Sequence, residues 1–357
     1  MRTRHVLGAV LIAALAYLLF WPVPITPTAW SPPPVPSASE GPFAYNARLQ
    51  AAQVLAAGQG LGPEGLALDA EGRVYSGFID GRIFRLAADG QGIELLANTG
   101  GRPLGLAFAG ERLIVADAVK GLLALEPDGR LTTLSTESDG VPFRFVDDVD
   151  VAADGRIYFS DASSRFGPAE LMADFFEHGG NGRLLRYDPA TGQTETLLDG
   201  LYFANGIALG PDDAYVLVNE TGRYQITRYW LSGDKAGTHD LFIANLPGFP
   251  DNVSFNGSDT FWLALYAPRT PDLDWLLERP FLRKVVYRLP AFLHPAPVMH
   301  GWVLGLDLNG QVVANAQYKG EGAFAPITSV KQHGDTLYLG SLSYPGLARI
   351  PVAAVRP

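Results

Sequence analysis

The sequence contains no cysteine, and its charged residues are few and mostly acidic. Without cysteine the chain forms no disulfides, and thiolate catalysis and cysteine-based zinc sites are excluded. Only 18% of the 357 residues are charged, and 27 lysines and arginines oppose 37 aspartates and glutamates, which gives a formal net charge of −10. A nucleic-acid surface would be basic, so we expect no nucleic-acid partner. The acidity fits a cation site or simple solubility equally well.

Hydrophobic residues, in contrast, make up 47% of the chain, which also contains 40 glycines and 27 prolines. This is enough apolar material for a large core. So many glycines and prolines favour short strands and turns over long helices. The composition therefore predicts a fold of many short strands.

A long apolar run, Val6 to Val23, follows the basic residues Arg2 and Arg4. About 20 apolar residues span a bilayer, so residues 1–24 are predicted to form an N-terminal transmembrane helix that anchors the chain. The flanking positive charge predicts that the rest of the chain lies on the exported side, periplasmic, extracellular or lumenal. The alternative is a cleaved signal peptide and a secreted protein. Residues 25–43 are proline-rich and are predicted to form an extended linker.

One unit recurs along the remaining sequence. Its first copy, GPEGLALDAEGRVYSG from Gly62, reads as an alternating strand, a Gly/Asp turn and a second strand, which is the hairpin signal. Further copies begin at the following positions: Gly101, Val146, Ala204, Pro250 and Ile327. Most are followed by two more strands, and a four-strand unit repeated every 40–60 residues or so is typical of propeller blades. We therefore predict an all-β fold, a six-bladed β-propeller with four-stranded blades, over residues 44–357.

Two insertions interrupt the repeats, at residues 163–181 and 267–300. The first contains AELMADFFEHG, in which apolar residues recur at helical spacing. The second is a basic amphipathic segment broken by Pro280 and Pro290. It is interpreted either as a packed lid or brace between blades, or as a segment that contacts the membrane surface.

Polar residues stand where the innermost strands begin, although a hairpin does not need them there. Because the inner strands of successive blades begin around one end of a central channel, residues far apart in sequence meet there. The polar residues at these positions are Glu64, Asp147, Asp148, Asn205, Asp251 and Asn252. Carboxylate and amide oxygens are the ligands that calcium prefers. The alternative is that these side chains cap turns.

The two other repeats carry Pro103-Leu104 and Thr328-Ser329 at the matching position. These residues are expected to line the substrate wall rather than to bind metal. No histidine clusters with the polar residues, which disfavours zinc and copper. The histidines themselves are expected to be solvated surface residues.

Four segments carry a resemblance to a known family. They are FVDDVDVAADGRIYFSDASSRF from Phe145, GRLLRYDPATGQTETLLDGLYFANGIALGPDDAYVLVNETGRYQITRYWL from Gly182, LPGFPDNVSFNGSDTFWLALY from Leu246, and LYLGSL from Leu337. The chain resembles the strictosidine synthase-like and gluconolactonase (SMP-30) superfamily of six-bladed propellers. It is most similar to the membrane-anchored branch typified by adipocyte plasma membrane-associated protein, and the resemblance covers essentially the whole chain.

This resemblance implies a Ca²⁺ ion in the channel, held by one residue from each of four blades. By motif these ligands fall on Glu64, Asp147, Asn205 and Asp251. Asp147 departs from the family pattern, which has asparagine there, and the added negative charge would strengthen divalent binding and make the site less electrophilic. Asp148 is then expected to support the ligands.

The implied function is calcium-dependent hydrolysis of small lactones or aryl esters, with Asp251 as ligand and also as base or nucleophile. A different reading is a non-catalytic, membrane-tethered binding or scaffold propeller whose calcium is structural. A third is a strictosidine synthase-type lyase. Those enzymes use a glutamate near the start of the last blade, where this chain has Thr328, so the third reading is disfavoured. The sequence carries no signal for an oligomeric state.

Overall fold

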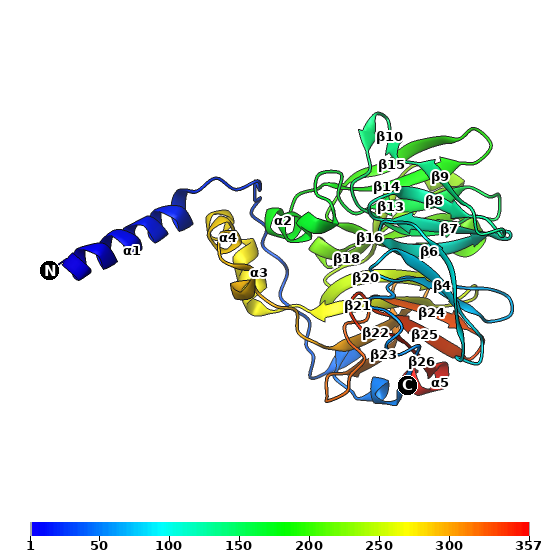
Figure 1. The fold of residues 1–357 in the computed structure, drawn as a ribbon. Coiled ribbons are helices and arrows are strands. Elements are labelled where there is room, and N and C mark those ends of the chain that lie inside the picture. The colour runs from blue at the N-terminus through cyan, green and yellow to red at the C-terminus, as the bar shows by residue number, and fades with distance from the viewer. Residues whose placement is uncertain (1, 357) are drawn as a thin grey trace.

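The structure, a computed structural model, describes residues 2–356 and places six four-stranded antiparallel sheets within that range. The sheets are arranged around a central axis as the blades of a propeller (Figure 1). Each predicted copy of the repeat supplies the two inner strands of one blade. The predicted all-β, six-bladed propeller is therefore confirmed.

The first three blades follow one another directly along the chain. Blade 1 comprises β2 (Leu66–Leu68), β3 (Val74–Gly77), β4 (Arg82–Leu86) and β5 (Ile93–Asn98). Blade 2 comprises β6 (Pro103–Ala109), β7 (Arg112–Asp117), β8 (Gly121–Leu125) and β9 (Leu131–Ser135). A small hairpin, β10 (Glu137–Ser138) with β11 (Val141–Pro142), leads to blade 3, which comprises β12 (Val146–Val151), β13 (Ile157–Asp161), β14 (Gly182–Asp188) and β15 (Gln193–Leu201).

The last three blades complete the ring. Blade 4 comprises β16 (Ala204–Leu209), β17 (Tyr215–Glu220), β18 (Gln225–Trp230) and β19 (His239–Ile243). Blade 5 comprises β20 (Gly248–Phe255), β21 (Phe261–Pro268), β22 (Gly301–Leu306) and β23 (Val312–Tyr318). Blade 6 comprises β24 (Ser329–His333), β25 (Thr336–Gly340), β26 (Leu347–Pro351) and, as its outer strand, β1 (Gln53–Leu55) from the N-terminal side.

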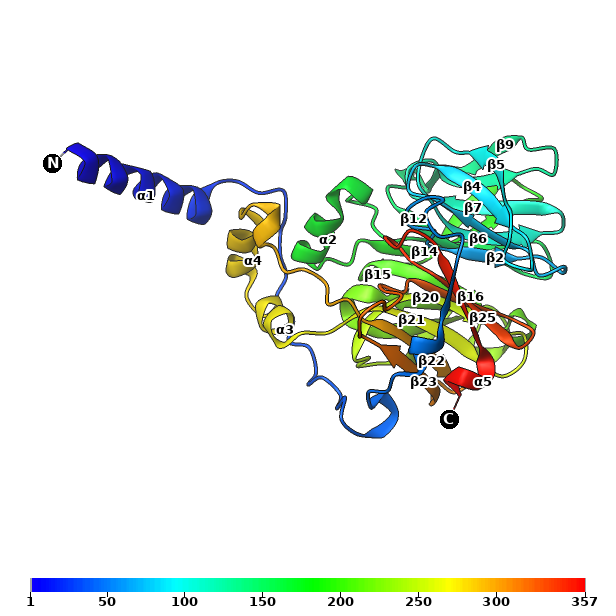
Figure 2. The ribbon, with the colours of Figure 1, turned by 60° about the horizontal axis from the view of Figure 1, so that its bottom comes forward.

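The helices lie outside the blades. They are α1 (Arg2–Phe20), α2 (Leu171–Glu177), α3 (Pro271–Leu277), α4 (Pro280–Tyr287) and α5 (Val352–Val355). Short 3₁₀ turns occupy Gly41–Phe43, Arg48–Ala51, Pro168–Glu170, Pro211–Asp213, Thr221–Arg223, Gly233–Lys235 and Ala291–Leu293. Helix α1 projects away from the propeller, and α3 and α4 lie between it and the blades (Figures 1 and 2). Within the described residues, no helix meets the length and apolarity that crossing a bilayer requires, so the transmembrane helix stays a prediction.

The first hairpin shows how local sequence makes the strands. Gly72 adopts a positive φ of 77°, which a residue with a side chain rarely adopts. The Asp69 carboxylate accepts a hydrogen bond from the backbone N–H of Arg73 at 2.9 Å and so closes the turn. The two strands then pair in register, with Leu66 opposite Ser76.

The core lies between neighbouring blades. One cluster joins blade 1 residues such as Ile83 to blade 2 residues such as Val115. Between blades 5 and 6, the fully buried Trp262 donates from its indole nitrogen to the Gln332 side-chain oxygen at 2.7 Å. Because every blade buries both faces against its neighbours, the ring fixes the inner strands around the channel.

Candidate metal centre in the channel

The inner strands of four blades are irregular at the predicted site positions. The pairing register shifts between Val146 and Val149, between Ala204 and Ile207, and between Pro250 and Val253, and blade 2 has the same shift. Such bulges turn a side chain away from the ordinary alternation of a strand. The shifts enclose Asp147 with Asp148, Asn205 with Gly206, Asp251 with Asn252, and Leu104 with Gly105. Three of these pairs include a predicted ligand.

Glycines next to these positions let the strands approach one another closely. A Cβ atom added to Gly65 would lie 2.1 Å from the Leu104 carbonyl oxygen, and one added to Gly206 would lie 2.4 Å from the Cα of Asn252. No side chain fits at such distances. The glycines therefore allow the starts of neighbouring inner strands to converge at one end of the channel.

The four predicted ligands all lie buried at this end of the channel. Their exposed fractions are 3% for Glu64, 3% for Asp147, 5% for Asn205 and 6% for Asp251. Each has one buried oxygen for which no described residue provides a hydrogen bond: Glu64 Oε2, Asp147 Oδ1, Asn205 Oδ1 and Asp251 Oδ1. Buried polar atoms are normally paired, so four unpaired oxygens from four blades need an explanation. This donor set has the chemistry that a hard cation such as Ca²⁺ binds.

The raised pKa values of the buried carboxyls are consistent with a site that binds a cation. Burial raises the pKa of the Glu64 carboxyl to about 7, and the charge of Asp148 adds to the increase. Burial, followed by the charges of Glu64 and Asp251, raises the pKa of Asp147 well above its usual range. Burial and the Glu64 charge do the same for Asp251. A cation among these carboxyls would favour their ionised forms.

The acidic side chains do not form a metal site by themselves. Among the described residues, no three histidine, aspartate or glutamate side chains make a group that could hold a metal ion. Carboxylates alone therefore do not establish the ion. Calcium binding at these four residues stays a prediction.

The residues beside the predicted ligands hold the site in place. The Asn252 side-chain amide donates to Glu64 Oε1 at 3.3 Å across the channel. The Thr328 hydroxyl donates to the Glu64 carbonyl oxygen at 3.4 Å, and its own carbonyl accepts from the Asn252 N–H at 2.9 Å. Asn252 and Thr328 thus position Glu64.

Asp148 faces the neighbouring blade instead of the four unpaired oxygens. Its Oδ2 accepts from the backbone N–H of Ile207 at 3.0 Å, and its Oδ1 accepts from that of Val149 at 2.9 Å. Burial raises its pKa to about 6, with the charge of Lys331 opposing the rise. Asp148 therefore joins the bulge of blade 3 to that of blade 4.

Two buried residues at the site were missed by the sequence prediction. Arg102 is 8% exposed, donates from Nη1 to the Gly62 carbonyl at 2.8 Å, and has no described partner for Nη2. Its charge acts on Glu64 and Asp147. Asn219 donates to the Asp251 carbonyl and also keeps an unpaired oxygen. The available signals were an arginine just before the inner strand of blade 2 and an asparagine inside an apolar strand.

Helix α2, which belongs to the first insertion, covers the starts of the inner strands of blades 4 and 5. The ring of Phe175 lies 4.8 Å from that of Phe203 and 6.4 Å from that of Phe249, measured between centroids. Phe203 and Phe249 each stand two residues before a predicted ligand. The insertion therefore forms a lid over this end of the channel.

Two buried histidines, one at the end of α2 and one at the start of β22, correct the expectation that all histidines are surface residues. His178 is 5% exposed and His300 is 6% exposed. Burial lowers the pKa of each to about 4. His178 bonds to the Gly222 carbonyl through Nε2 at 2.8 Å, because the loop after α2 folds back onto blade 4.

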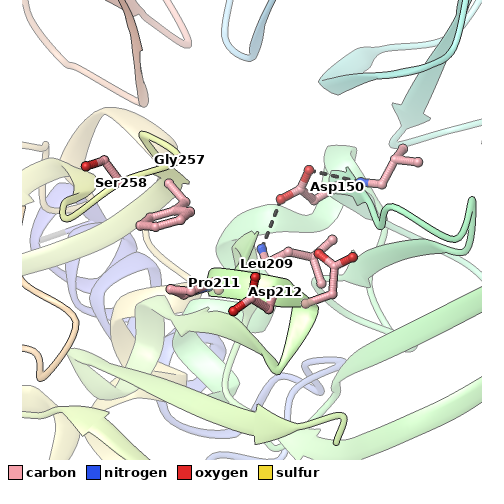
Figure 3. A pocket seen from close by; sticks show the side chains of 10 residues that line it. Asp150, Leu209, Pro211, Asp212, Gly257 and Ser258 are labelled. Carbon is pink, nitrogen blue, oxygen red and sulfur yellow. Dashed lines mark hydrogen bonds between the residues drawn. The ribbon is translucent and has the colours of Figure 1, made fainter.

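A cavity of about 390 Å³ lies at the opposite end of the channel (Figure 3). Its lining comes from the ends of inner strands, including Asp150, Leu209 and Phe255. Asp150 Oδ2 accepts from the Leu209 N–H at 2.9 Å, which joins two blades there. This cavity does not include any of the four predicted ligands.

Comparison with known proteins agrees with the fold and extends along most of the chain. The strictosidine synthase family profile matches residues 147–234, and the strictosidine synthase-like N-terminal profile matches residues 41–86. Protein STRICTOSIDINE SYNTHASE-LIKE 4 of Arabidopsis thaliana is 36% identical over 311 residues, which cover 85% of this chain and 82% of that protein. Human adipocyte plasma membrane-associated protein is 34% identical over 363 residues, covering 95% and 86%. A gluconolactonase from Xanthomonas campestris has the same fold, with a TM-score of 0.62 at 20% identity, over 92% of this chain and 97% of its own.

Proposed function

The chain belongs to the strictosidine synthase-like family, and from that premise we propose that it is a calcium-dependent hydrolase of lactones or aryl esters. The observation that carries the proposal is the set of four unpaired, buried oxygens contributed by four blades. No ordinary structural role explains all four together. A cation bound among them would account for all four.

Glu64, Asp147, Asn205 and Asp251 would hold the ion. Bound calcium would polarise the carbonyl of the substrate and stabilise the negative charge that develops on its oxygen. Asp147 adds a carboxylate where the family pattern has an amide, and Arg102 nearby offsets part of that charge. Asn252 and Thr328 would keep Glu64 oriented.

Asp251 would move the proton. In the proposed reaction the carboxylate of Asp251 accepts a proton from water through the oxygen that does not face the ion, while the water oxygen bonds to the acyl carbon. The bond from this carbon to the leaving oxygen then breaks, and the proton passes from Asp251 to that oxygen. Asp251 must be ionised to begin the cycle. Burial and the charge of Glu64 raise its pKa, and a nearby cation would favour its ionised form.

The condensation catalysed by strictosidine synthases is disfavoured for this chain. Thr328 stands at the start of the last blade and is fully buried. Its hydroxyl bonds to backbone and is not an acid–base group near neutral pH. Hydrolysis needs no such carboxylate, and the similar fold includes a gluconolactonase.

The test is hydrolysis of phenyl acetate and of a δ-lactone by the purified full chain, with added calcium and with chelator. We expect turnover only with calcium, and its loss in Glu64→Gln. Glu71→Gln is the matched control, because Glu71 lies nearby in sequence with a side chain that is 66% exposed. Absence of turnover in wild-type protein with calcium would refute the hydrolase proposal.

The burial of the site favours one alternative, a binding or scaffold propeller with a structural ion. Asp251 is only 6% exposed, and Phe175 covers the strand starts. Under this alternative, calcium would raise the melting temperature of the protein without any turnover. The same samples therefore distinguish the two functions.

We also propose that the chain is membrane-anchored through residues 1–24, with the propeller on the exported side. Exposed apolar side chains along α1 support this, among them Leu7 at 65%, Ile12 at 70% and Phe20 at 78%. A relative whose name places it at the plasma membrane aligns with 95% of the chain. Cleavage of the segment would give a secreted protein instead.

A further inference from the structure

The proline-rich segment after α1 is attached to the propeller, not free of it. Residues 23–34, here called the strap, run along α2 and α3. The backbone N–H of Thr28 donates to the Glu177 carbonyl at 3.2 Å, and that of Trp30 donates to the Leu277 carbonyl at 3.1 Å. Ile25, 2% exposed, packs in a cluster with residues of both insertions. The strap therefore fixes where α1 leaves the propeller.

Two buried arginines complete this attachment, one within α4 and one at its C-terminal end. Arg283, 1% exposed, donates to the carbonyls of Phe176 and Glu177 at 3.1 and 3.2 Å and to that of Thr28. Arg288 donates from Nε to the Trp21 carbonyl at 2.7 Å and from Nη1 to the Leu18 carbonyl at 2.8 Å. The C-terminal end of α1 is thus held directly against the end of α4.

The second insertion, residues 267–300, also exposes several large apolar side chains. The large apolar residues exposed between positions 275 and 299 are Trp275 (52%), Phe281 (55%), Phe292 (83%), Leu293 (54%), Val298 (44%) and Met299 (53%). Soluble surfaces seldom gather so many large apolar side chains within one short segment. Helices α3 and α4 lie on the side of the propeller from which α1 projects (Figures 1 and 2). We call these six residues the docking face.

We propose that the docking face lies in the headgroup region of a lipid bilayer as a second membrane attachment beside α1. The proposal rests on the proposed anchor, not on hydrolase activity. If α1 enters a bilayer, the hydrogen bonds of Arg288 hold α4 within one side-chain length of the point where α1 emerges. The docking face is then next to lipid.

Composition favours lipid over a second copy of the chain. Of the four basic residues in 275–299, Arg283 and Arg288 are buried against backbone carbonyls, so Arg279 and Lys284 are the two that reach the surface of this segment. The Arg279 guanidinium lies 4.0 Å from the centroid of the Trp275 ring. Exposed tryptophan beside basic residues is typical of membrane interfaces, and basic residues attract anionic headgroups.

The orientation has a consequence for the site. The insertions connect the second and third strands of blades 3 and 5, so they lie at the end of the channel where the inner strands begin. Docking would therefore turn the end that carries Glu64 and Asp251 toward the membrane. A substrate would approach this end from the headgroup region.

The absence of cysteine permits a direct test by labelling single positions. Full-length Phe281→Cys and Phe292→Cys, each carrying an environment-sensitive fluorophore, are reconstituted into vesicles of phosphatidylcholine and phosphatidylserine. Ile12→Cys reports the anchor. Leu95→Cys and Leu241→Cys are matched controls, because these side chains are 59% and 55% exposed on outer strands of the blades. All five positions are exposed, so labelling leaves the core intact.

We expect blue-shifted emission at positions 281 and 292, quenching by spin-labelled lipid, and iodide quenching about threefold weaker than at 95 and 241, because iodide stays in water. Iodide quenching at 281 and 292 equal to that of the controls would overturn the proposal, whatever position 12 reports. Protection from both quenchers, with a dimeric mass, would overturn it in favour of a second copy. Lipid contact at 12 without contact at 281 and 292 would retain the anchor and reject the docking face.

Discussion

Glu64 has opposite effects on stability with and without a cation. Burial raises its pKa to about 7, from an ordinary value of 4.5. The folded state then binds the proton more tightly than the unfolded state, so this group lowers the stability of the ion-free protein as pH rises from about 4.5 to 7. One pKa unit corresponds to about 1.4 kcal/mol, which puts the cost on the order of 3 to 4 kcal/mol above pH 7. With calcium bound to the native state, ionised Glu64 would instead stabilise the folded protein.

We predict that Glu64→Gln stabilises the protein without calcium at pH 8, by roughly 3 kcal/mol, because the amide needs no proton. The gain should shrink as pH falls below 7 and vanish below about pH 4.5, where the wild-type carboxyl is protonated in both states. With calcium the order should reverse, since the variant offers the ion a neutral amide oxygen in place of a charged carboxylate. Thermal melting at both pH values, with calcium and with chelator, measures this, and Glu71→Gln should behave as wild type. Equal calcium-induced shifts in wild type and Glu64→Gln would argue against ligation by Glu64.

At the scale of elements, the alternating hydrophobic pattern of the sequence was enough to predict the blades. Contacts between segments that are distant in sequence could not be predicted from it. Alternation and Gly/Asp turns mark inner strands such as β2 and β12 locally. Arg102 stands in a loop, and only the meeting of blades 1 and 2 brings its charge to Glu64. The pairing of Gln53 with Arg349 spans nearly the whole chain and has no local signal. Likewise, prolines in the strap suggested an extended segment but not its bonds to α2 and α3.

The strap contributes a pH-dependent contact. The ring of Trp30 stacks on that of His178 at 4.9 Å between centroids. Burial lowers the pKa of His178 to about 4, from 6.5, so the unfolded state binds its proton more tightly. The stability that neutral His178 contributes is complete above pH 6.5 and is lost as pH falls through 4. The shift corresponds to an upper bound of about 3 to 4 kcal/mol.

We predict that His178→Asn reduces the loss of stability between pH 6.5 and 4, and weakens attachment of the strap at neutral pH. Asparagine tolerates the positive φ of 53° at this position. Asp174 has a pKa raised to about 6, mainly by burial, and acts in the opposite direction, so the informative quantity is the difference between wild type and variant. Denaturant unfolding across this pH range and hydrogen exchange at Thr28 and Trp30 measure the two effects. His239→Asn, at an exposed site, is the control, and an identical pH profile in His178→Asn would contradict the assignment.

For the whole molecule, ring closure depends on one short strand. Blade 6 takes β24, β25 and β26 from the C-terminal end and β1 from the N-terminal side. Leu55 of β1 packs in a cluster with Leu66 and Phe84 of blade 1 and with Tyr338 and Leu347 of blade 6. This side chain therefore joins the first blade to the last.

We predict that Leu55→Ala loosens both blades that β1 joins, in addition to the roughly 2–4 kcal/mol that a buried leucine truncation costs. Leu201→Ala is the matched control, because Leu201 is 4% exposed against 5% for Leu55 and also lies on an outer strand. Its strand β15 follows β14 directly in the chain, so truncation there removes contacts without opening the ring. Native-state hydrogen exchange should show faster opening of blades 1 and 6 together in Leu55→Ala, and of blade 3 with its neighbours in Leu201→Ala. Exchange confined to β1 itself would mean that the ring stays closed without this contact, and that packing between the other blades is sufficient to hold the channel site together.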